Sequence, residues 1–191
     1  MTDIYYKKEL KYKFEDKILR FEVGNTLFST FDIDHGTDIL VRHIKLEQNP
    51  KTILDIGCGV GVIGICLASK YPDAKVTCVD RDLLAVRYTK NNTEKNNLSN
   101  LTTIGSVGME EVKDEKFDLI VSNVPAKIGD EAITQEFILK PLDQLNEGGS
   151  LWIVVVSALN RLIPKVARDF NLSAIEVKKR SGHSVYRITK K

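Results

Sequence analysis

The chain has 191 residues, enough to bury a hydrophobic core without disulfides or structural metals. Apolar residues make up 42% and charged residues 28%, which indicates a globular rather than a disordered protein. The longest apolar run, Leu151 to Val156, is too short to cross a bilayer, and the N-terminus lacks the apolar segment of a secretion signal. These features predict a cytoplasmic protein with no membrane segment.

The net charge of +2 does not by itself indicate a nucleic-acid partner. Both ends are mildly basic, which suits either phosphate contacts or a solvated surface, and the C-terminal stretch carries Lys178, Lys179, Arg180, Arg187, Lys190 and Lys191. Cys58, Cys66 and Cys78 have no C-x-x-C spacing, and their odd number fits a reducing compartment. The three histidines are scattered, so no metal site is expected.

The first thirty residues predict a small β extension. Apolar and charged residues alternate over Leu10 to Phe14 and again over Ile18 to Val23, with a turn signal at Asp16-Lys17 between them. A second turn signal, Gly24-Asn25, precedes a short stretch, Thr26 to Phe28. A β-hairpin or small meander is therefore expected ahead of the main fold.

From residue 31 onward the pattern alternates between helices and strands, which is typical of a parallel sheet covered on both faces. Gly148-Gly149 predicts a turn, and Pro164 is expected in the first turn of its helix or at a kink. The expected helices are Thr37–Leu46, Val62–Lys70, Asp82–Asn92, Glu131–Leu145 and Leu159–Phe170. The expected strands are Thr52–Ile56, Lys75–Val79, Leu101–Ile104, Phe117–Val121, Leu151–Val156, Ser173–Val177 and Ser184–Ile188.

The last two strands have no helix between them, so one of them must run antiparallel to the rest. The sequence therefore predicts an α/β, Rossmann-like fold with a seven-stranded, mostly parallel sheet that ends in an antiparallel hairpin. The whole chain, residues 1–191, is expected to form a single domain. Residues 1–30 would be its β extension and residues 31–191 its core.

The strongest local motif runs from Asp55 to Gly64 and lies between an expected strand and an expected helix. Its glycines allow a sharp turn and close approach to a ligand, and Gly59, Gly61 and Gly64 satisfy the dinucleotide pattern G-x-G-x-x-G. Asp55 would repel a pyrophosphate but can accept hydrogen bonds from a cationic ligand. Asp80, at the end of the next strand, can bind both ribose hydroxyls. S-adenosylmethionine fits better than a nicotinamide dinucleotide, although each acid alone could be a turn or cap carboxylate.

These motifs resemble the class I methyltransferases, and in particular the small-domain branch that includes ribosomal RNA guanine-N2 methyltransferases and single-domain archaeal proteins. The resemblance covers about Phe28 to Val156 and rests on Phe28-Ser29, Asp34-His35-Gly36-Thr37, the glycine motif, Asp80 and the segment Asn123 to Gly129. It implies that the segment before the first core strand covers the cofactor and that Gly105-Ser106-Val107 flanks the adenine. The cofactor contacts expected in this way are Gly36, Thr37, Asp55, Gly57, Cys58, Gly59, Gly61, Asp80, Arg81, Ser106 and Asn123.

The family's catalytic signature is Asn-Pro-Pro followed by an aromatic residue, and this chain has Asn123, Val124, Pro125 and Ala126. The lone pair of an exocyclic amine is delocalised into its ring, so the amine is a poor nucleophile. The Asn123 side-chain oxygen and the Val124 carbonyl can accept its two hydrogens and aim the lone pair at the methyl group. Pro125 would hold these acceptors in a rigid turn. The alternative is an ordinary turn at the end of a strand.

Ala126 is the main departure from the family pattern because it cannot stack on a base. Phe28 or Phe31 would then cover the base, or else the substrate is not planar. Lys127 is a candidate phosphate contact, with a solvated loop lysine as its alternative.

The resemblance implies methyl transfer from S-adenosylmethionine to an exocyclic amine in RNA, with guanine N2 or cytosine N4 of ribosomal RNA as the acceptor. The alternatives are a protein glutamine N-methyltransferase, which needs the same two acceptors, and a cofactor-binding protein without catalysis. A nicotinamide oxidoreductase ranks last.

Overall fold

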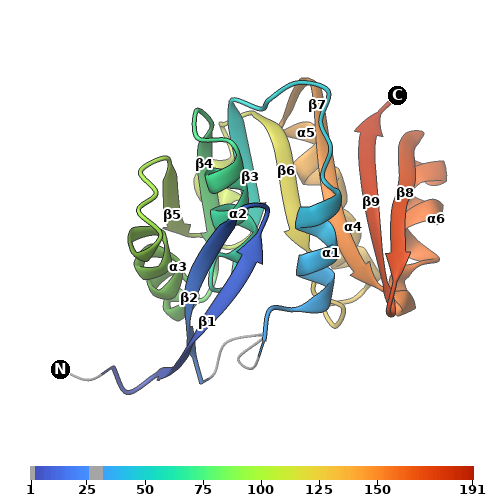
Figure 1. Cartoon of the computed structure of the whole chain (residues 1–191). Coiled ribbons are helices and arrows are strands. Elements are labelled where there is room, and N and C mark those ends of the chain that lie inside the picture. The colour runs from blue at the N-terminus through green and yellow to red at the C-terminus, as the bar shows by residue number, and fades with distance from the viewer. Residues whose placement is uncertain (1–2, 26–31) are drawn as a thin grey trace.

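The computed structural model describes residues 3–25 and 32–191, and its main feature is a seven-stranded sheet with the order β5-β4-β3-β6-β7-β9-β8 (Figure 1). Strands β3 to β7 pair in parallel, whereas β9 pairs antiparallel with both β7 and β8. This confirms the predicted fold. The strands are β3 (Thr52–Ile56), β4 (Lys75–Asp80), β5 (Leu101–Gly105), β6 (Phe117–Asn123), β7 (Leu145–Val156), β8 (Leu172–Arg180) and β9 (His183–Lys190).

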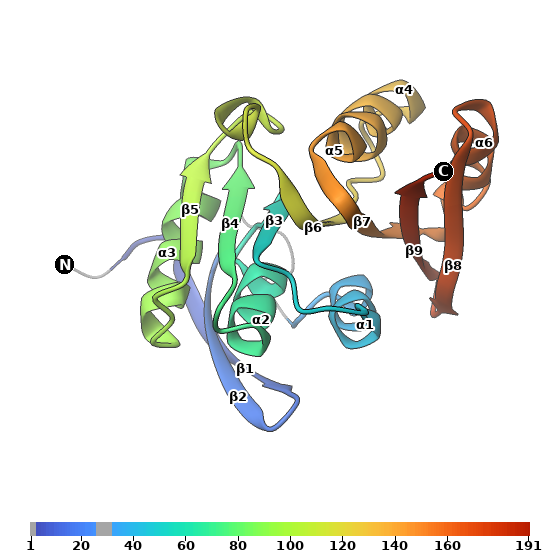
Figure 2. The ribbon, with the colours of Figure 1, turned by 90° about the horizontal axis from the view of Figure 1, so that it is seen from above.

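Helices cover both faces of the sheet, with α1, α2 and α3 on one side and α4, α5 and α6 on the other (Figure 2). Neighbouring residues of the central strand β3 therefore enter different cores: Ile53 packs with the first set of helices and Leu54 with the second. This explains the unbroken apolar strands. The helices are α1 (His35–His43), α2 (Val62–Lys70), α3 (Leu83–Lys95), α4 (Asp130–Thr134), α5 (Lys140–Asp143) and α6 (Leu162–Asp169), with short turns η1 (Glu110–Val112), η2 (Gln135–Leu139) and η3 (Ser157–Leu159).

The N-terminal hairpin consists of β1 (Tyr6–Phe14) and β2 (Lys17–Gly24), which pair antiparallel and confirm the β extension. Tyr12 and Phe21 belong to the same core as α1 and α2, so the hairpin packs on the body rather than standing apart. The short stretch expected at Thr26 to Phe28 lies outside the described residues. That the chain forms a single domain stays a prediction.

Several expected elements differ in their bounds: the helix expected over Thr37–Leu46 is α1, His35–His43, and two further helices differ at a proline. The helix expected over Glu131–Leu145 is divided into α4, the π-helical turn η2 and α5. Pro141 explains this division, because it has no N–H to donate and its ring crowds the carbonyl four residues earlier, so the preceding turn widens. The helix expected over Leu159–Phe170 begins at Leu162, and Pro164 lies in its first turn.

The turn expected at Gly148-Gly149 is instead a bulge within β7. Leu145 lies opposite Phe117, but the next pair is Ser150 opposite Leu119, so the residues between form the bulge. Gly148 has a φ of +74°, the left-handed conformation that glycine adopts freely. No helix within residues 3–25 and 32–191 has both the length and the apolar character to cross a membrane.

Candidate active site

The glycine loop joins the end of β3 to the start of α2 and borders open space. Gly57 and Gly59 have φ values of +70° and +57°, and a Cβ atom added to either would meet no atom within 4 Å. A Cβ on Gly61 would instead lie 2.7 Å from the Thr89 side chain of α3. Gly57 and Gly59 therefore leave room for a ligand, whereas Gly61 allows the close packing of α2 on α3. The Cys58 side chain is buried 3.6 Å from Thr89 Oγ1, so only its backbone can face the ligand.

Two carboxylates support this loop from the ends of β3 and β4. Asp55 is fully buried, and its Oδ2 accepts a 2.9 Å hydrogen bond from the Gly64 backbone. Its Oδ1 has no partner in the described part of the chain, and burial raises the pKa of Asp55 to about 7. Asp80 accepts 2.9 Å hydrogen bonds from the backbone nitrogens of Gly59 and Asp82. Each Asp80 oxygen thus keeps a lone pair for a further donor.

These features fit S-adenosylmethionine. The open side of Gly57 and Gly59 admits a ligand close to the backbone, and the lone pairs of Asp80 match a pair of ribose hydroxyls. One oxygen of Asp55 has no partner in the described residues and is left to accept a further hydrogen bond. When bound, the cofactor supplies the electrophilic methyl group.

The Asn123 amide, at the end of β6, is fixed in one orientation. Its Nδ2 donates to Asp34 Oδ2 at 2.7 Å and to Thr37 Oγ1 at 3.0 Å. Asp34 is also the N-cap of α1 and accepts from the Thr37 backbone nitrogen at 2.9 Å. Because a carboxylate can only accept, the Asn123 nitrogen must face Asp34, and its oxygen is left as an acceptor for another molecule.

The residue after Asn123 is anchored to the sheet. The Val124 backbone nitrogen donates to the Val154 carbonyl of β7 at 3.0 Å, and its side chain is buried. Pro125 and Lys127 follow in an exposed loop. The strand end therefore holds Asn123 and the Val124 carbonyl in adjacent, fixed positions.

The other residues predicted to contact the cofactor or the substrate differ in how close they lie to Asn123 and Asp80. Gly36 and Thr37 are brought to Asn123 by α1. The Ser106 backbone nitrogen donates to the Asp80 carbonyl at 2.9 Å, which places Ser106 beside the end of β4. Arg81 is exposed next to Asp80. Phe28 and Phe31, predicted to cover the base, lie outside the described residues.

Sequence reasoning missed Asp34 and His183 as site residues. Asp34 precedes a helix and lies three residues before Thr37, a capping pattern, but nothing local links it to Asn123. His183 begins β9, and its ring packs on Gly36: a Cβ atom there would lie 2.8 Å from His183 Cδ2. No local signal in the sequence indicates this contact.

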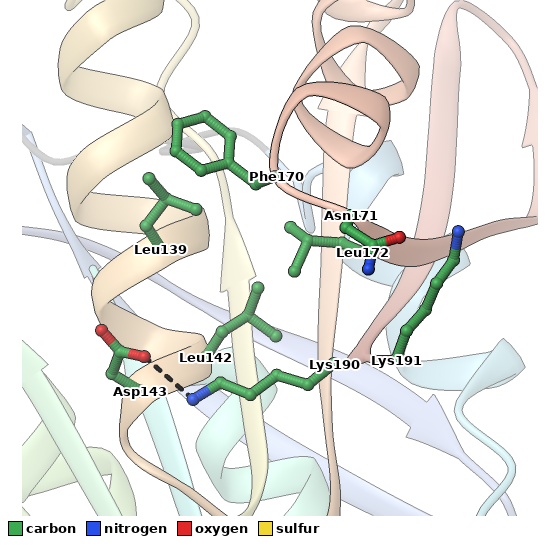
Figure 3. A pocket seen from close by; sticks show the side chains of 8 residues that line it. All are labelled: Leu139, Leu142, Asp143, Phe170, Asn171, Leu172, Lys190 and Lys191. Carbon is green, nitrogen blue, oxygen red and sulfur yellow. Dashed lines mark hydrogen bonds and ion pairs between the residues drawn. The ribbon is translucent and has the colours of Figure 1, made fainter.

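The hollow drawn in Figure 3 is separate from this centre. It has a volume of about 430 Å³ and lies between α5 and the far end of the β8–β9 hairpin, where Lys190 pairs with Asp143 at 2.9 Å. Lys190 is at the opposite end of β9 from His183. The hollow therefore lies at the end of the strands away from His183.

The fold, the glycine loop and the two carboxylates together are those of a methyltransferase domain. Residues 19–187 match the family described as "Methyltransferase small domain", and the chain belongs to that family.

Curated relatives agree with this assignment. The ribosomal RNA small subunit methyltransferase C of Hahella chejuensis is 33% identical over 166 residues, which cover 85% of this chain and 46% of that protein. The ribosomal RNA large subunit methyltransferase G of Photobacterium profundum is 32% identical, covering 78% of this chain and 42% of that protein. The chain thus spans about half the length of these two relatives.

Solved structures share the fold. The 16S rRNA N2 methyltransferase of T. thermophilus, in complex with AdoMet and guanosine, superposes with a TM-score of 0.81 at 21% identity, covering 96% of this chain and 50% of that one. A methyltransferase from Pyrococcus furiosus has a TM-score of 0.66 at 26% identity, with 81% of each chain covered.

Proposed function

We propose that this chain transfers a methyl group from S-adenosylmethionine to an exocyclic amine of a base in ribosomal RNA. The observation that carries the proposal is the fixed Asn123 amide, whose nitrogen is held by Asp34 and Thr37 so that its oxygen is free to accept. An oxygen held in this way can accept a hydrogen bond from the N–H of an amine substrate. It also argues against a cofactor-binding protein without catalysis, since such a protein would not require an oriented acceptor there.

The proposed chemistry depends on orientation. Asn123 Oδ1 and the Val124 carbonyl accept the two hydrogens of the amine, which turns the nitrogen lone pair out of conjugation with its ring and toward the methyl group. Holding the amine and the methyl group in the reactive geometry can provide a large part of the decrease in activation free energy. The bond from nitrogen to methyl would form as the bond from sulfur to methyl breaks, which leaves S-adenosylhomocysteine; the same two acceptors stabilise the hydrogens of the cationic amine, which then loses one proton to water. A strong base is not needed.

Guanine N2 is the preferred acceptor. Two of the similar proteins are named as ribosomal RNA methyltransferases, and the T. thermophilus structure contains guanosine together with AdoMet. Cytosine N4 presents the same two hydrogens and remains the second choice. A glutamine side-chain amide also has two hydrogens, so a protein acceptor is the outcome against which the proposal is tested.

The test is methyl transfer from labelled S-adenosylmethionine into the total RNA and total protein fractions of a cell extract. We expect label in RNA, as N2-methylguanosine, and its loss by at least about 100-fold in Asn123→Ala with unchanged cofactor binding. Asn146→Ala is the matched control, because Asn146 Nδ2 also donates to a carboxylate, Asp118, at 2.7 Å but at the opposite edge of the sheet. Label only in protein, or equal rates in Asn123→Ala and Asn146→Ala, would refute the proposal.

A further inference from the structure

The turn of the β8–β9 hairpin lies beside the proposed active site. Asn123 of β6 is opposite Val154 of β7, and two residues further along β7, Val156 is opposite His183 of β9. The Ser157 backbone nitrogen donates to the Gly182 carbonyl at 2.8 Å, which fastens the turn to the end of β7. Figure 1 shows the turn at the lower edge of the sheet, where β6 and β7 also end.

The turn is also rigid. Its two central residues, Ser181 and Gly182, have φ values of +49° and +77°, which match a two-residue type I′ hairpin turn. His183 Nδ1 donates to the Ser181 carbonyl at 3.0 Å, and the other side of its ring packs on Gly36. The segment that follows Arg180 therefore has a fixed position relative to Asp34 and Asn123.

Basic side chains are concentrated at this end of β8. Lys178, Lys179 and Arg180 are all exposed, and none has an ion pair or hydrogen bond to a side chain within residues 3–25 and 32–191. We refer to these three residues as the hairpin surface. At the far end of the same hairpin, by contrast, Lys190 is paired with Asp143.

Lysines on an edge strand can also serve to prevent pairing with another sheet. That purpose would favour basic residues along the whole strand. In β8, however, Leu172 to Val177 contains no lysine or arginine, and all three basic residues are the ones nearest the turn. Their placement follows the proposed active site rather than the open edge.

Acidic and basic side chains are separated along the end of the sheet at which the parallel strands finish. Acidic residues lie after β4 and β5, on the proposed cofactor side, and basic residues lie on the side of β7 to β9, where Arg161 adds a further exposed cation. Lys127 follows β6, close to the boundary, and the exposed acids Asp130 and Glu131 limit the basic half there. The acidic half contains Asp80, Asp82, Glu110 and Glu111, with the exposed Arg81 among them.

We propose that the hairpin surface binds the phosphate backbone of the RNA next to the nucleotide whose amine reaches Asn123. This inference rests on the proposed function. Exposed lysine and arginine side chains without carboxylate partners are the groups that neutralise phosphates, and a rigid turn places them at a constant distance from the reacting amine. A phosphate held there would fix the register of the RNA, while the acceptors at Asn123 select the amine.

The test measures RNA binding without catalysis, in the presence of S-adenosylhomocysteine. The probe is a fluorescently labelled single-stranded RNA of twelve nucleotides, titrated by anisotropy at several potassium chloride concentrations. The test variant is the triple substitution Lys178→Gln, Lys179→Gln and Arg180→Gln. The matched control removes three exposed lysines near the opposite edge, Lys45→Gln, Lys51→Gln and Lys191→Gln, so that both variants lose the same net charge.

We expect the test variant to bind the RNA at least about 10-fold more weakly at low salt. The slope of log affinity against log salt should become shallower by about 2 units, at roughly 0.7 per phosphate contact of a single strand. The control should keep the wild-type slope, and both variants should bind S-adenosylhomocysteine as the wild type does. Equal losses in the two variants, or no loss in either, would overturn the inference.

Methyl transfer is scored separately, so the two proposals can fail independently. Normal RNA binding by the wild type with label only in protein would refute the RNA substrate. A test variant that binds RNA like the wild type would overturn the hairpin surface as an RNA site, whichever fraction carries the label.

Discussion

Asp34 Oδ2 accepts a 2.7 Å hydrogen bond from Asn123 Nδ2, across 89 residues of sequence. The bond joins the N-terminus of α1 to the end of β6. Asp34 contacts neither cofactor nor substrate in the proposed mechanism, so it is a positioning residue: it determines which end of the Asn123 amide faces the acceptor amine.

Asp34→Ser separates this role from helix capping. Serine is a good N-cap but is too short to reach Asn123, whereas Asp34→Ala removes both interactions. We expect both variants to lose kcat by about 10- to 100-fold with little change in the KM for S-adenosylmethionine, because the acceptor is misoriented. Only Asp34→Ala should also lose about 1 kcal/mol of unfolding free energy. Wild-type kcat in Asp34→Ser would contradict the positioning role.

The space beside the glycine loop can be probed with a pair of glycines. Gly59 and Gly148 both have positive φ, and a Cβ on either would meet no atom within 4 Å. Alanine at each position should therefore destabilise the protein by a similar amount, about 1–2 kcal/mol. Only Gly59→Ala places a methyl group in the proposed cofactor site, so it should weaken S-adenosylhomocysteine binding by at least about 10-fold in calorimetry. Equal affinities in the two variants would place the cofactor elsewhere.

Asp55 predicts a pH dependence of stability. Its pKa rises from 3.8 to about 7 on folding because the carboxyl is buried. Between these values the folded protein holds a proton that the unfolded chain releases, so this contribution to stability is full below about pH 4 and is lost as pH rises through 7.

Urea unfolding of the wild type and Asp55→Asn at pH 5 and pH 8 measures this effect. The free energy of unfolding of the wild type, relative to the variant, should fall by on the order of 2 kcal/mol between the two pH values. Asparagine does not titrate, so the comparison removes the pH dependence of other groups. A constant difference between the two proteins would show that Asp55 stays ionised in the fold.

Asn92 connects the N-terminal hairpin to the glycine loop. Its side-chain nitrogen donates to the carbonyls of Val60 and Glu22, and its oxygen accepts from the Glu22 nitrogen. Asn96, one turn later on α3, makes the equivalent pair of bonds to Arg20 of β2 but has no bond to the loop. The two residues thus share the hairpin contact and differ in the contact with the glycine loop.

We expect Asn92→Ala and Asn96→Ala both to lower thermal stability, more so for Asn92, which is fully buried and leaves three backbone groups unpaired. Only Asn92→Ala should also weaken S-adenosylhomocysteine binding, by about 3- to 10-fold, because the loop loses a support. The affinity is measured by calorimetry at a temperature where both variants are folded. A similar loss of affinity in Asn96→Ala would mean that the hairpin, rather than the bond to Val60, supports the site.

Local signals predict most of the core elements. The sequence predicts a helix over Val62–Lys70 and a strand over Thr52–Ile56, and α2 and β3 have these bounds. Both lie next to the glycine loop and are apolar, so their limits are marked by residues within the element or beside it. The π-helical turn η2 and the bulge at Gly148-Gly149 are less accessible to sequence reasoning, since their geometry depends on what the neighbouring strand and helix accommodate.

The proposed site divides in the same way. The glycine loop, Asp55, Asp80 and Asn123 can be selected from the sequence because parallel strands end at one edge of the sheet and each residue lies at or beside such an end. The sequence by itself therefore determined the fold class, the cofactor class and the residues at the strand ends. Only the tertiary structure decided that Asp34 orients Asn123 and that His183 brings a basic turn beside them, because contacts between residues tens of positions apart depend on how strands and helices are packed, which no local pattern records.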